Sequence, residues 1–188
     1  MAKAYYTLPK IALIACGGTI GVEWSVVHDT VIPSKTGNKR LRDHIDQQIQ
    51  LHRSLLFVDL FNKDSRAITD KDRDKIIAKI KNLRAKGIRH FLITHGTFTM
   101  TQTAAYLNDR CASKGLSDIY AVICGSMIPN FGFTLSDAQF NIGFALAKLS
   151  MMDEADQTGA WICMNGLLSR PENIVKNVKK ARFEIKKK

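Results

Sequence analysis

The sequence predicts an α/β fold in which a doubly wound, mainly parallel sheet carries helices on both faces. Three observations predict it: short runs that are almost wholly apolar, stretches of helical length between most of them, and glycine turns directly after two of the runs. Strands that are apolar on both faces are typical of a parallel sheet covered on both sides. With 188 residues, the chain is expected to form a single domain.

Five short apolar runs are the expected buried strands. They are residues 10–16, 55–60, 90–94, 120–124 and 160–164. All of them are far shorter than the roughly 20 apolar residues that a membrane-spanning helix needs, so no membrane partner is expected.

Four segments have the pattern of helices, namely residues 38–51, 70–86, 101–113 and 135–152. The second is the clearest, because Thr69 and Asp72 have the spacing of a capping box and Gly87 follows its end. Its apolar side chains recur at helical spacing, at Ile76, Ile80 and Leu83.

The segment 21–33 is rich in β-branched residues and leaves the first strand without an immediate helix. We expect a hairpin or loop there that covers a site, because ligands bind at the carboxyl ends of parallel strands.

The net charge of +11 is unevenly distributed, because residues 170–188 hold eight basic and two acidic side chains. A basic tail over 177–188 attracts polyanions, so nucleic acid is a possible partner only through this tail. No aromatic residues interleave its lysines as a stacking platform for bases, which favours a solvated, frayed terminus.

No pattern for a metal or cofactor is present. The four cysteines, at 16, 111, 124 and 163, share no metal-ligand spacing, and both nucleotide-binding glycine motifs are absent. We therefore expect neither metal nor cofactor, and reduced, structural cysteines. The first residues contain no continuous apolar run with a cleavage site, so a cytoplasmic location is expected.

Two turns that contain threonine follow expected strands. Thr19 lies in Cys-Gly-Gly-Thr-Ile-Gly at 16–21, and Thr97 lies in Thr-His-Gly-Thr-Phe-Thr at 94–99. Each turn read alone is a strand-to-loop connection or, at Thr99, a helix cap. Together they predict a shared site with a threonine nucleophile or a pair of hydroxyls.

The segments 11–21 (IALIACGGTIG) and 91–100 (FLITHGTFTM) resemble the two signature segments of the bacterial-type L-asparaginases. Further matches keep the family's order, at 63–65 (KDS), 124–129 (CGSMIP), 136–141 (SDAQFN) and 164–165, running on to Lys176. The similarity extends over essentially the whole chain and looks closer to the cytoplasmic type I branch. It implies one asparaginase N-terminal-type domain over 1–188, without the family's C-terminal domain.

The resemblance implies a role for each matching position. Thr19 matches the nucleophile that attacks the side-chain amide, whereas Thr97 and Lys176 match two members of a Thr-Asp-Lys relay. Asp64 and Ser65 match positions that bind the substrate's α-carboxylate and α-amino ends. The other positions expected against a small amide such as L-asparagine are Gly18, Gly96, Phe98 and Ser126. Backbone amides beside Thr97 are the expected oxyanion hole.

Three departures from the family predict weak or absent turnover. Phe98 replaces the relay aspartate, and Val31 stands where the family has the tyrosine of its mobile loop. The third is the missing C-terminal domain, which completes the active site of a neighbouring subunit in full-length members. Losing single members of a catalytic unit often costs on the order of a thousandfold in rate.

Three functions stay open on the sequence alone. The first is a minimal amidohydrolase acting on L-asparagine or a related small amide. The second is an impaired pseudoenzyme that binds a small ligand or dimerises. The third is a subunit of an RNA-associated amidotransferase, with the basic tail on RNA.

Two further side chains near the motifs have expected roles. Asp137 could supply the missing carboxylate, although a cap on the helix that begins near Ser136 is favoured. His95 is expected to shape its turn. We also expect a homo-oligomer, because the surface that a second domain covers in the family would be an exposed apolar patch. Its candidate residues are Phe140, Phe144, Met151 and Met152.

Overall fold

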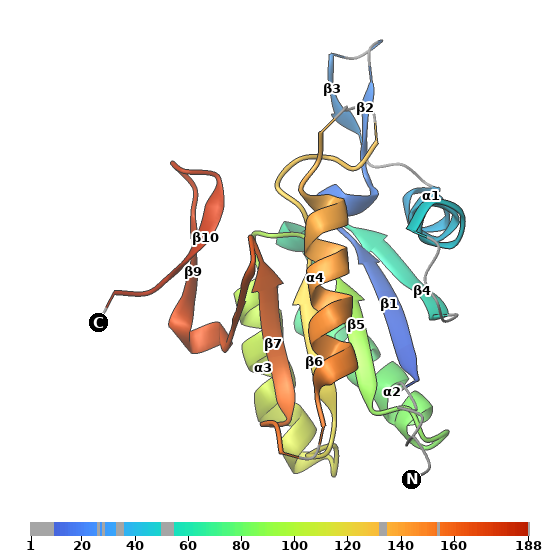
Figure 1. Ribbon diagram of the computed structural model, residues 1–188, viewed down its shortest axis with the longest axis vertical. Helices are drawn as coiled ribbons and strands as arrows, with labels where there is room; N and C mark the ends of the chain where they lie inside the picture. Colours follow the sequence, from blue (N-terminus) through green and yellow to red (C-terminus); the bar gives the residue numbers. More distant parts are fainter. Residues whose placement is uncertain are drawn as a thin grey trace, which may run out of the picture.

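A six-stranded sheet forms the centre of the computed structural model, which describes residues 10–25, 27, 29–32, 36–49, 55–131, 135–153 and 155–187. The strand order is β4-β1-β5-β6-β7-β8 (Figure 1). The strand bounds are β1 Ile11–Gly17, β4 Leu56–Lys63, β5 His90–Thr94, β6 Tyr120–Cys124, β7 Gly159–Met164 and β8 Leu167–Ser169. Every neighbouring pair is parallel except β7 and β8, which confirms the mainly parallel sheet.

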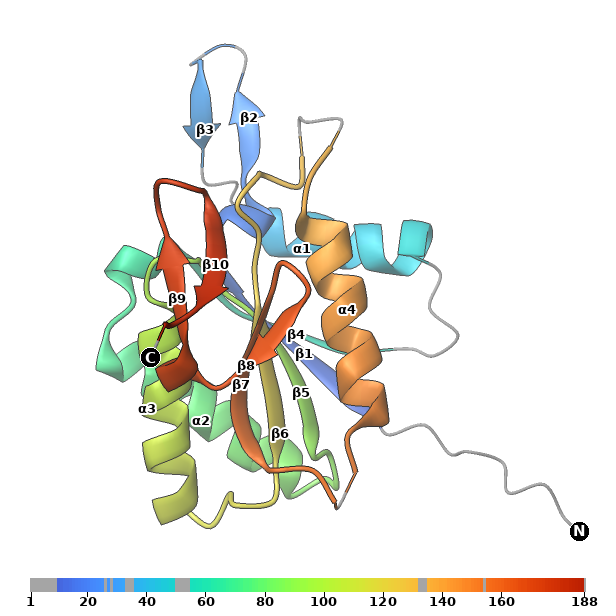
Figure 2. The same cartoon turned by 60° about the vertical axis from the view of Figure 1, so that its left-hand side comes forward.

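Helices cover both faces of this sheet, as expected (Figures 1 and 2). Helices α2 (Asp70–Arg84) and α3 (Met100–Ser113) lie on one face, and α1 (Gly37–His44) and α4 (Ala138–Met151) lie on the other. Strand β1 explains the arrangement, because its alternate side chains are buried in two different cores. Ala12, Ile14 and Cys16 pack toward α2 and α3, and Ile11, Leu13 and Ala15 pack toward α1 and α4.

The expected helices form with small changes at their ends. The capping box at α2 is present, since Asp72 accepts hydrogen bonds from the Thr69 N–H and hydroxyl. Helix α1 continues into a π-helical turn at Ile45–Ile49, and the expected end at residue 51 lies outside the described residues. Helix α4 begins at Ala138 rather than at residue 135. No helix in the described ranges is long and apolar enough to cross a membrane.

The order of the strands creates a switch point beside β1. The chain passes from β1 to β4 on one side and then crosses to β5 on the other side. The carboxyl ends of these three strands meet at one edge of the sheet, where α/β folds bind ligands. Above that edge, β2 (Glu23–Ser25) and β3 (Thr30–Ile32) form the expected hairpin (Figure 1). Val26, His28 and Pro33 of the expected segment lie outside the described residues.

The expectation of a frayed tail over 177–188 is wrong. Strands β9 (Ile174–Asn177) and β10 (Arg182–Ile185) form an antiparallel hairpin beside α3 (Figure 2). Two of its apolar side chains hold it in place, because Ile174 and Phe183 are buried in the same core as α2 and α3. Burying one such side chain stabilises the fold by about 2 kcal/mol, and the hairpin lysines Lys179 and Lys180 stay exposed to solvent.

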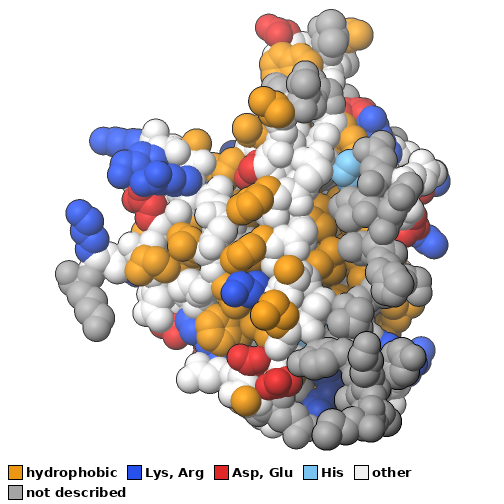
Figure 3. Space-filling view, viewed as in Figure 1, with side chains coloured by type: hydrophobic (Ala, Val, Ile, Leu, Met, Phe, Trp, Pro, Cys, Tyr) orange, Lys and Arg blue, Asp and Glu red, His pale blue; other side chains and the backbone are white. Residues whose placement is uncertain are grey.

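Several apolar side chains are exposed over α4, with a basic side chain among them, as Figure 3 shows. Phe140 is 58% exposed and Met151 72% exposed, whereas Phe144 is half-buried. Met152 is buried in the core, so its place among the surface candidates was wrong. All four cysteines are buried and form no disulfide.

Candidate active site

A cavity of about 350 Å³ lies at the switch point, at the carboxyl ends of β1, β4 and β5. Seven of the nine residues expected at the site line it: Gly18, Thr19, Asp64, Ser65, Gly96, Thr97 and Phe98. Thr19 and Thr97 therefore lie at the same edge of the sheet and face one cavity.

The first threonine turn packs directly on the second. Gly18 has a φ of +87°, and a Cβ built on it would lie 2.3 Å from the Gly96 nitrogen. Only glycine allows this approach. The Gly18 N–H also donates to the Lys63 carbonyl at 3.1 Å, which ties the end of β1 to the end of β4.

Ser65 holds the second turn from the side of β4. Its Oγ accepts the Phe98 N–H at 3.2 Å, and its carbonyl accepts the Thr99 hydroxyl at 2.7 Å. One of the two backbone amides beside Thr97 is thus already engaged and is not free to bind an oxyanion. Asp64 accepts the Arg66 N–H at 2.8 Å and so caps the short helical turn that begins at Ser65.

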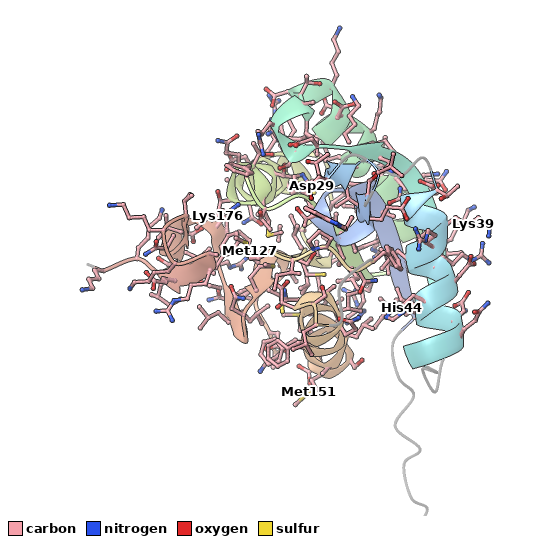
Figure 4. All side chains as sticks on the ribbon, turned by 90° about the horizontal axis from the view of Figure 1, so that it is seen from above. Asp29, Lys39, His44, Met127, Met151 and Lys176 are labelled. Atoms are coloured by element: carbon pink, nitrogen blue, oxygen red, sulfur yellow. The ribbon has the colours of Figure 1, made fainter. Side chains whose placement is uncertain are left out.

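Lys176 reaches the cavity from the hairpin. Its Nζ donates to Thr97 Oγ1 at 2.7 Å, although Lys176 comes from β9, 79 residues further along the chain. Seen from above the strand ends, Lys176 and Met127 both lie near the centre of the molecule (Figure 4). Partial burial, followed by the positive charge of Arg66, lowers the pKa of Lys176, while Asp64 opposes the shift.

Two asparagines connect the hairpin to the core. Asn141 on α4 accepts the Asn165 N–H at 3.0 Å, and Asn165 accepts the Phe183 N–H at 2.9 Å. Phe183 lies opposite Lys176 in the hairpin. The matches at 136–141 and 164–165 assigned no role to these asparagines, and the structure places them as supports for the lysine.

Asp137 occupies the expected N-cap position of α4, but its carboxylate does not cap the helix. Its carboxylate accepts the N–H groups of Met127 and Ile128 at 2.9–3.0 Å, so it fixes the loop whose Met127 lines the cavity. It caps no N–H of the helix and is not a cavity-lining carboxylate. The carboxylate instead accepts the side-chain amide of Asn141 at 2.9 Å, and the Ala138 N–H at the start of α4 donates to Ser136 Oγ at 3.1 Å.

Phe98 brings two cations to the cavity wall. Its side chain is 50% exposed, and its ring centroid lies 4.2 Å from Arg66 Cζ and 3.8 Å from Lys176 Nζ. Contacts of this kind between cations and aromatic rings are favourable. Arg66 was not expected from the sequence, although it directly follows Asp64 and Ser65.

His95 shapes the turn as expected. Its Nδ1 donates to the Gly96 carbonyl at 2.8 Å, which requires Nε2 to accept the Thr103 hydroxyl at 3.0 Å. Thr103 accepts in turn from Arg73 Nε at 3.1 Å. Burial lowers the pKa of His95 to about 4, so the ring is neutral near pH 7.

Neither Ser126 nor Val31 is among the described side chains that line the cavity. Ser126 is fully buried behind the cavity wall, and its hydroxyl has no hydrogen-bond partner in the part of the chain that the structure describes. The side chain of Val31 lies outside the described atoms. Within those ranges, no three His, Cys, Asp or Glu side chains group as metal ligands.

Fold and site define a doubly wound α/β domain with two threonines and a lysine at its switch point. The chain belongs to the asparaginase family, because residues 10–185 match the family model described as Asparaginase, N-terminal.

Two relatives agree with this membership. A glutaminase-asparaginase of Acinetobacter glutaminasificans is 30% identical over 115 residues, which are 61% of this chain and 33% of that protein. The crystal structure of a probable cytoplasmic L-asparaginase from Campylobacter jejuni superposes with a TM-score of 0.68 at 25% identity, over 94% of this chain and 50% of that one. The chain thus spans half or less of the length of these relatives.

Proposed function

We propose that this domain is an L-asparaginase-type amidohydrolase that slowly releases ammonia from a small amide, with Thr19 as the nucleophile. One observation carries the proposal: Lys176 Nζ lies 2.7 Å from Thr97 Oγ1, at a cavity that Thr19 also lines. A hydroxyl paired with a lysine of lowered pKa is an arrangement that can move a proton.

The reaction takes place in two steps. Thr19 Oγ1 attacks the amide carbonyl, the carbon–nitrogen bond breaks, and the nitrogen takes up a proton and leaves as ammonia. Water then attacks the resulting ester, which frees Thr19 and releases the carboxylate product. The alcohol is a poor nucleophile until it loses its proton, and neutral Lys176 can accept that proton through Thr97.

Slow turnover follows from position 98. Lys176 Nζ lies over the Phe98 ring at 3.8 Å, where the family resemblance implies a carboxylate. A ring does not accept a proton or hold the lysine through a charge-assisted hydrogen bond. Loss of one member of a proton relay commonly lowers kcat on the order of a thousandfold.

A coupled ammonia assay tests the proposal on the wild type, Thr19→Ala and Thr19→Ser. The wild type and Thr19→Ser should release ammonia, because both carry a hydroxyl at position 19, and Thr19→Ala should fall to background. Equal rates in the wild type and Thr19→Ala would refute Thr19 as the nucleophile.

The second candidate is a small-ligand-binding domain without turnover. The observation that favours it is the intact cavity: Ser65 holds the Phe98 backbone in place although the side chain at 98 is no longer a carboxylate. Ligand binding with no ammonia release by the wild type would establish this candidate.

We also infer a homo-oligomer and a cytoplasmic location. The exposed apolar side chains of α4 support association, because patches of this kind drive self-assembly. The name of the Campylobacter jejuni relative supports the location. For nucleic acid, the one binding surface that we propose is the lysine-rich β9–β10 hairpin.

A further inference from the structure

We propose that the cavity selects small amides that carry a carboxylate and lack an ammonium group, such as succinamate, over L-asparagine. The reaction in this inference rests on the proposed function. The selectivity rests on the charges around the cavity.

The cavity wall has an excess of positive charge. Its charged lining residues are Lys63, Asp64 and Arg66. A fourth charge, that of Lys176, lies next to the lining because Lys176 Nζ is hydrogen-bonded to the lining residue Thr97. Lys63 is paired outside the cavity, because its Nζ lies 2.8 Å from the buried Asp72, which also pairs with Lys75 at 3.1 Å. Asp64 is then the one carboxylate among the described lining residues, opposed by two cations.

Asp64 is poorly placed to bind an ammonium group. Its Oδ1 already accepts the Arg66 N–H at 2.8 Å, and the Arg66 guanidinium lies beside it, with Nε 3.7 Å from the same oxygen. A ligand ammonium that approached this carboxylate would meet the guanidinium at short range, and like charges at such distances repel.

Phe98 gives no compensation for an ammonium group. An exposed aromatic ring can bind a cation, but this ring already lies under Arg66 Cζ at 4.2 Å and Lys176 Nζ at 3.8 Å. A third cation would be repelled by both. The lowered pKa of Lys176, to which Arg66 contributes, agrees with a positive potential at this place.

The same wall suits a carboxylate. The distance of 3.7 Å from Arg66 Nε to Asp64 is too long for a hydrogen bond, and the guanidinium donates to no other residue in the described part of the chain, so its donors are available to a ligand. Ser65 accepts the Phe98 N–H with its lone pairs and keeps its O–H as a donor. A ligand carboxylate can therefore bind Arg66 and Ser65, while its amide end faces the threonines.

Isothermal titration with succinate and L-aspartate measures the selectivity without turnover, because these two products differ only in the ammonium group. The wild type should bind succinate at least about fivefold more tightly than L-aspartate, which is the effect of one like-charge contact at about 4 Å in bulk water and therefore a lower limit for a contact beside the protein. Phe98→Asp should remove or reverse this preference. Phe98→Asn introduces a side chain of the same shape as aspartate but without its charge, so this variant should keep the preference for succinate.

Tighter binding of L-aspartate to the wild type, equal binding of both, or no binding of either overturns the inference. A preference that is unchanged in Phe98→Asp also overturns it. Selective succinate binding without ammonia release refutes the proposed function alone, and ammonia release with L-aspartate preferred refutes the selectivity alone.

Discussion

Acid should destabilise this fold through His95. Its pKa is about 4 in the folded chain against the ordinary 6.5, because burial disfavours the charged ring and the nearby charge of Arg73 adds to this effect, whereas the hydrogen bond to the Gly96 carbonyl opposes it. The unfolded chain therefore takes up a proton first as the pH falls. The stability linked to His95 is fully present above pH 6.5, is reduced by about 2 kcal/mol at pH 5 and by about 3 kcal/mol below pH 4.

Urea unfolding between pH 7.5 and 4.5, followed by circular dichroism, measures this loss. The difference between the wild type and His95→Gln isolates His95, because losses at the carboxylates are common to both proteins. The wild type should lose about 2 kcal/mol more than His95→Gln between pH 7.5 and 5. Parallel pH dependence of the wild type and His95→Gln would refute the reasoning.

Three further predictions follow from the same contacts. Asp72→Asn should destabilise the fold by about 3 kcal/mol in urea unfolding, because the buried carboxylate pairs with Lys63 and caps α2; an unchanged midpoint contradicts this. Asn165→Ala should lower the free energy of unfolding by about 1–2 kcal/mol, because it removes the hydrogen bond from the Phe183 N–H at a residue with φ of +53°. Since this bond supports the hairpin that carries Lys176, the variant should also lower kcat more than it raises KM; a change in KM alone contradicts this. Light scattering should find a homodimer or larger species that Phe140→Asp weakens, and a monomeric wild type at micromolar concentration excludes that surface.

Local patterns predicted five of the six strands of the sheet and missed the short antiparallel strand β8. Strands β5 and β6 have the predicted bounds, because each is a five-residue, mostly apolar run, which is long enough for a buried strand and too short for a helix. Thr19 and Thr97 could be brought together from the sequence because each follows a parallel strand through a glycine turn.

The remaining features depend on contacts between distant segments. Strands β9 and β10 were not predicted, because lysines dominate the composition of the last residues. They form because Phe183 is buried against the core. Asp137 has the position of a helix cap, but the two amides of Met127 and Ile128 bind its carboxylate instead. Arg66 lies over Phe98 because two loops meet there, which spacing along the chain does not reveal.

The pH dependence of kcat/KM for ammonia release tests the role of Lys176 most directly. Because burial and Arg66 lower the pKa of Lys176, kcat/KM should rise with pH and level off below the ordinary lysine value of 10.5. Lys176→Met should lower kcat/KM by about 100-fold or more and abolish the rise. A Lys176→Met profile with the height and shape of the wild type would contradict the assignment of Lys176 as the proton acceptor.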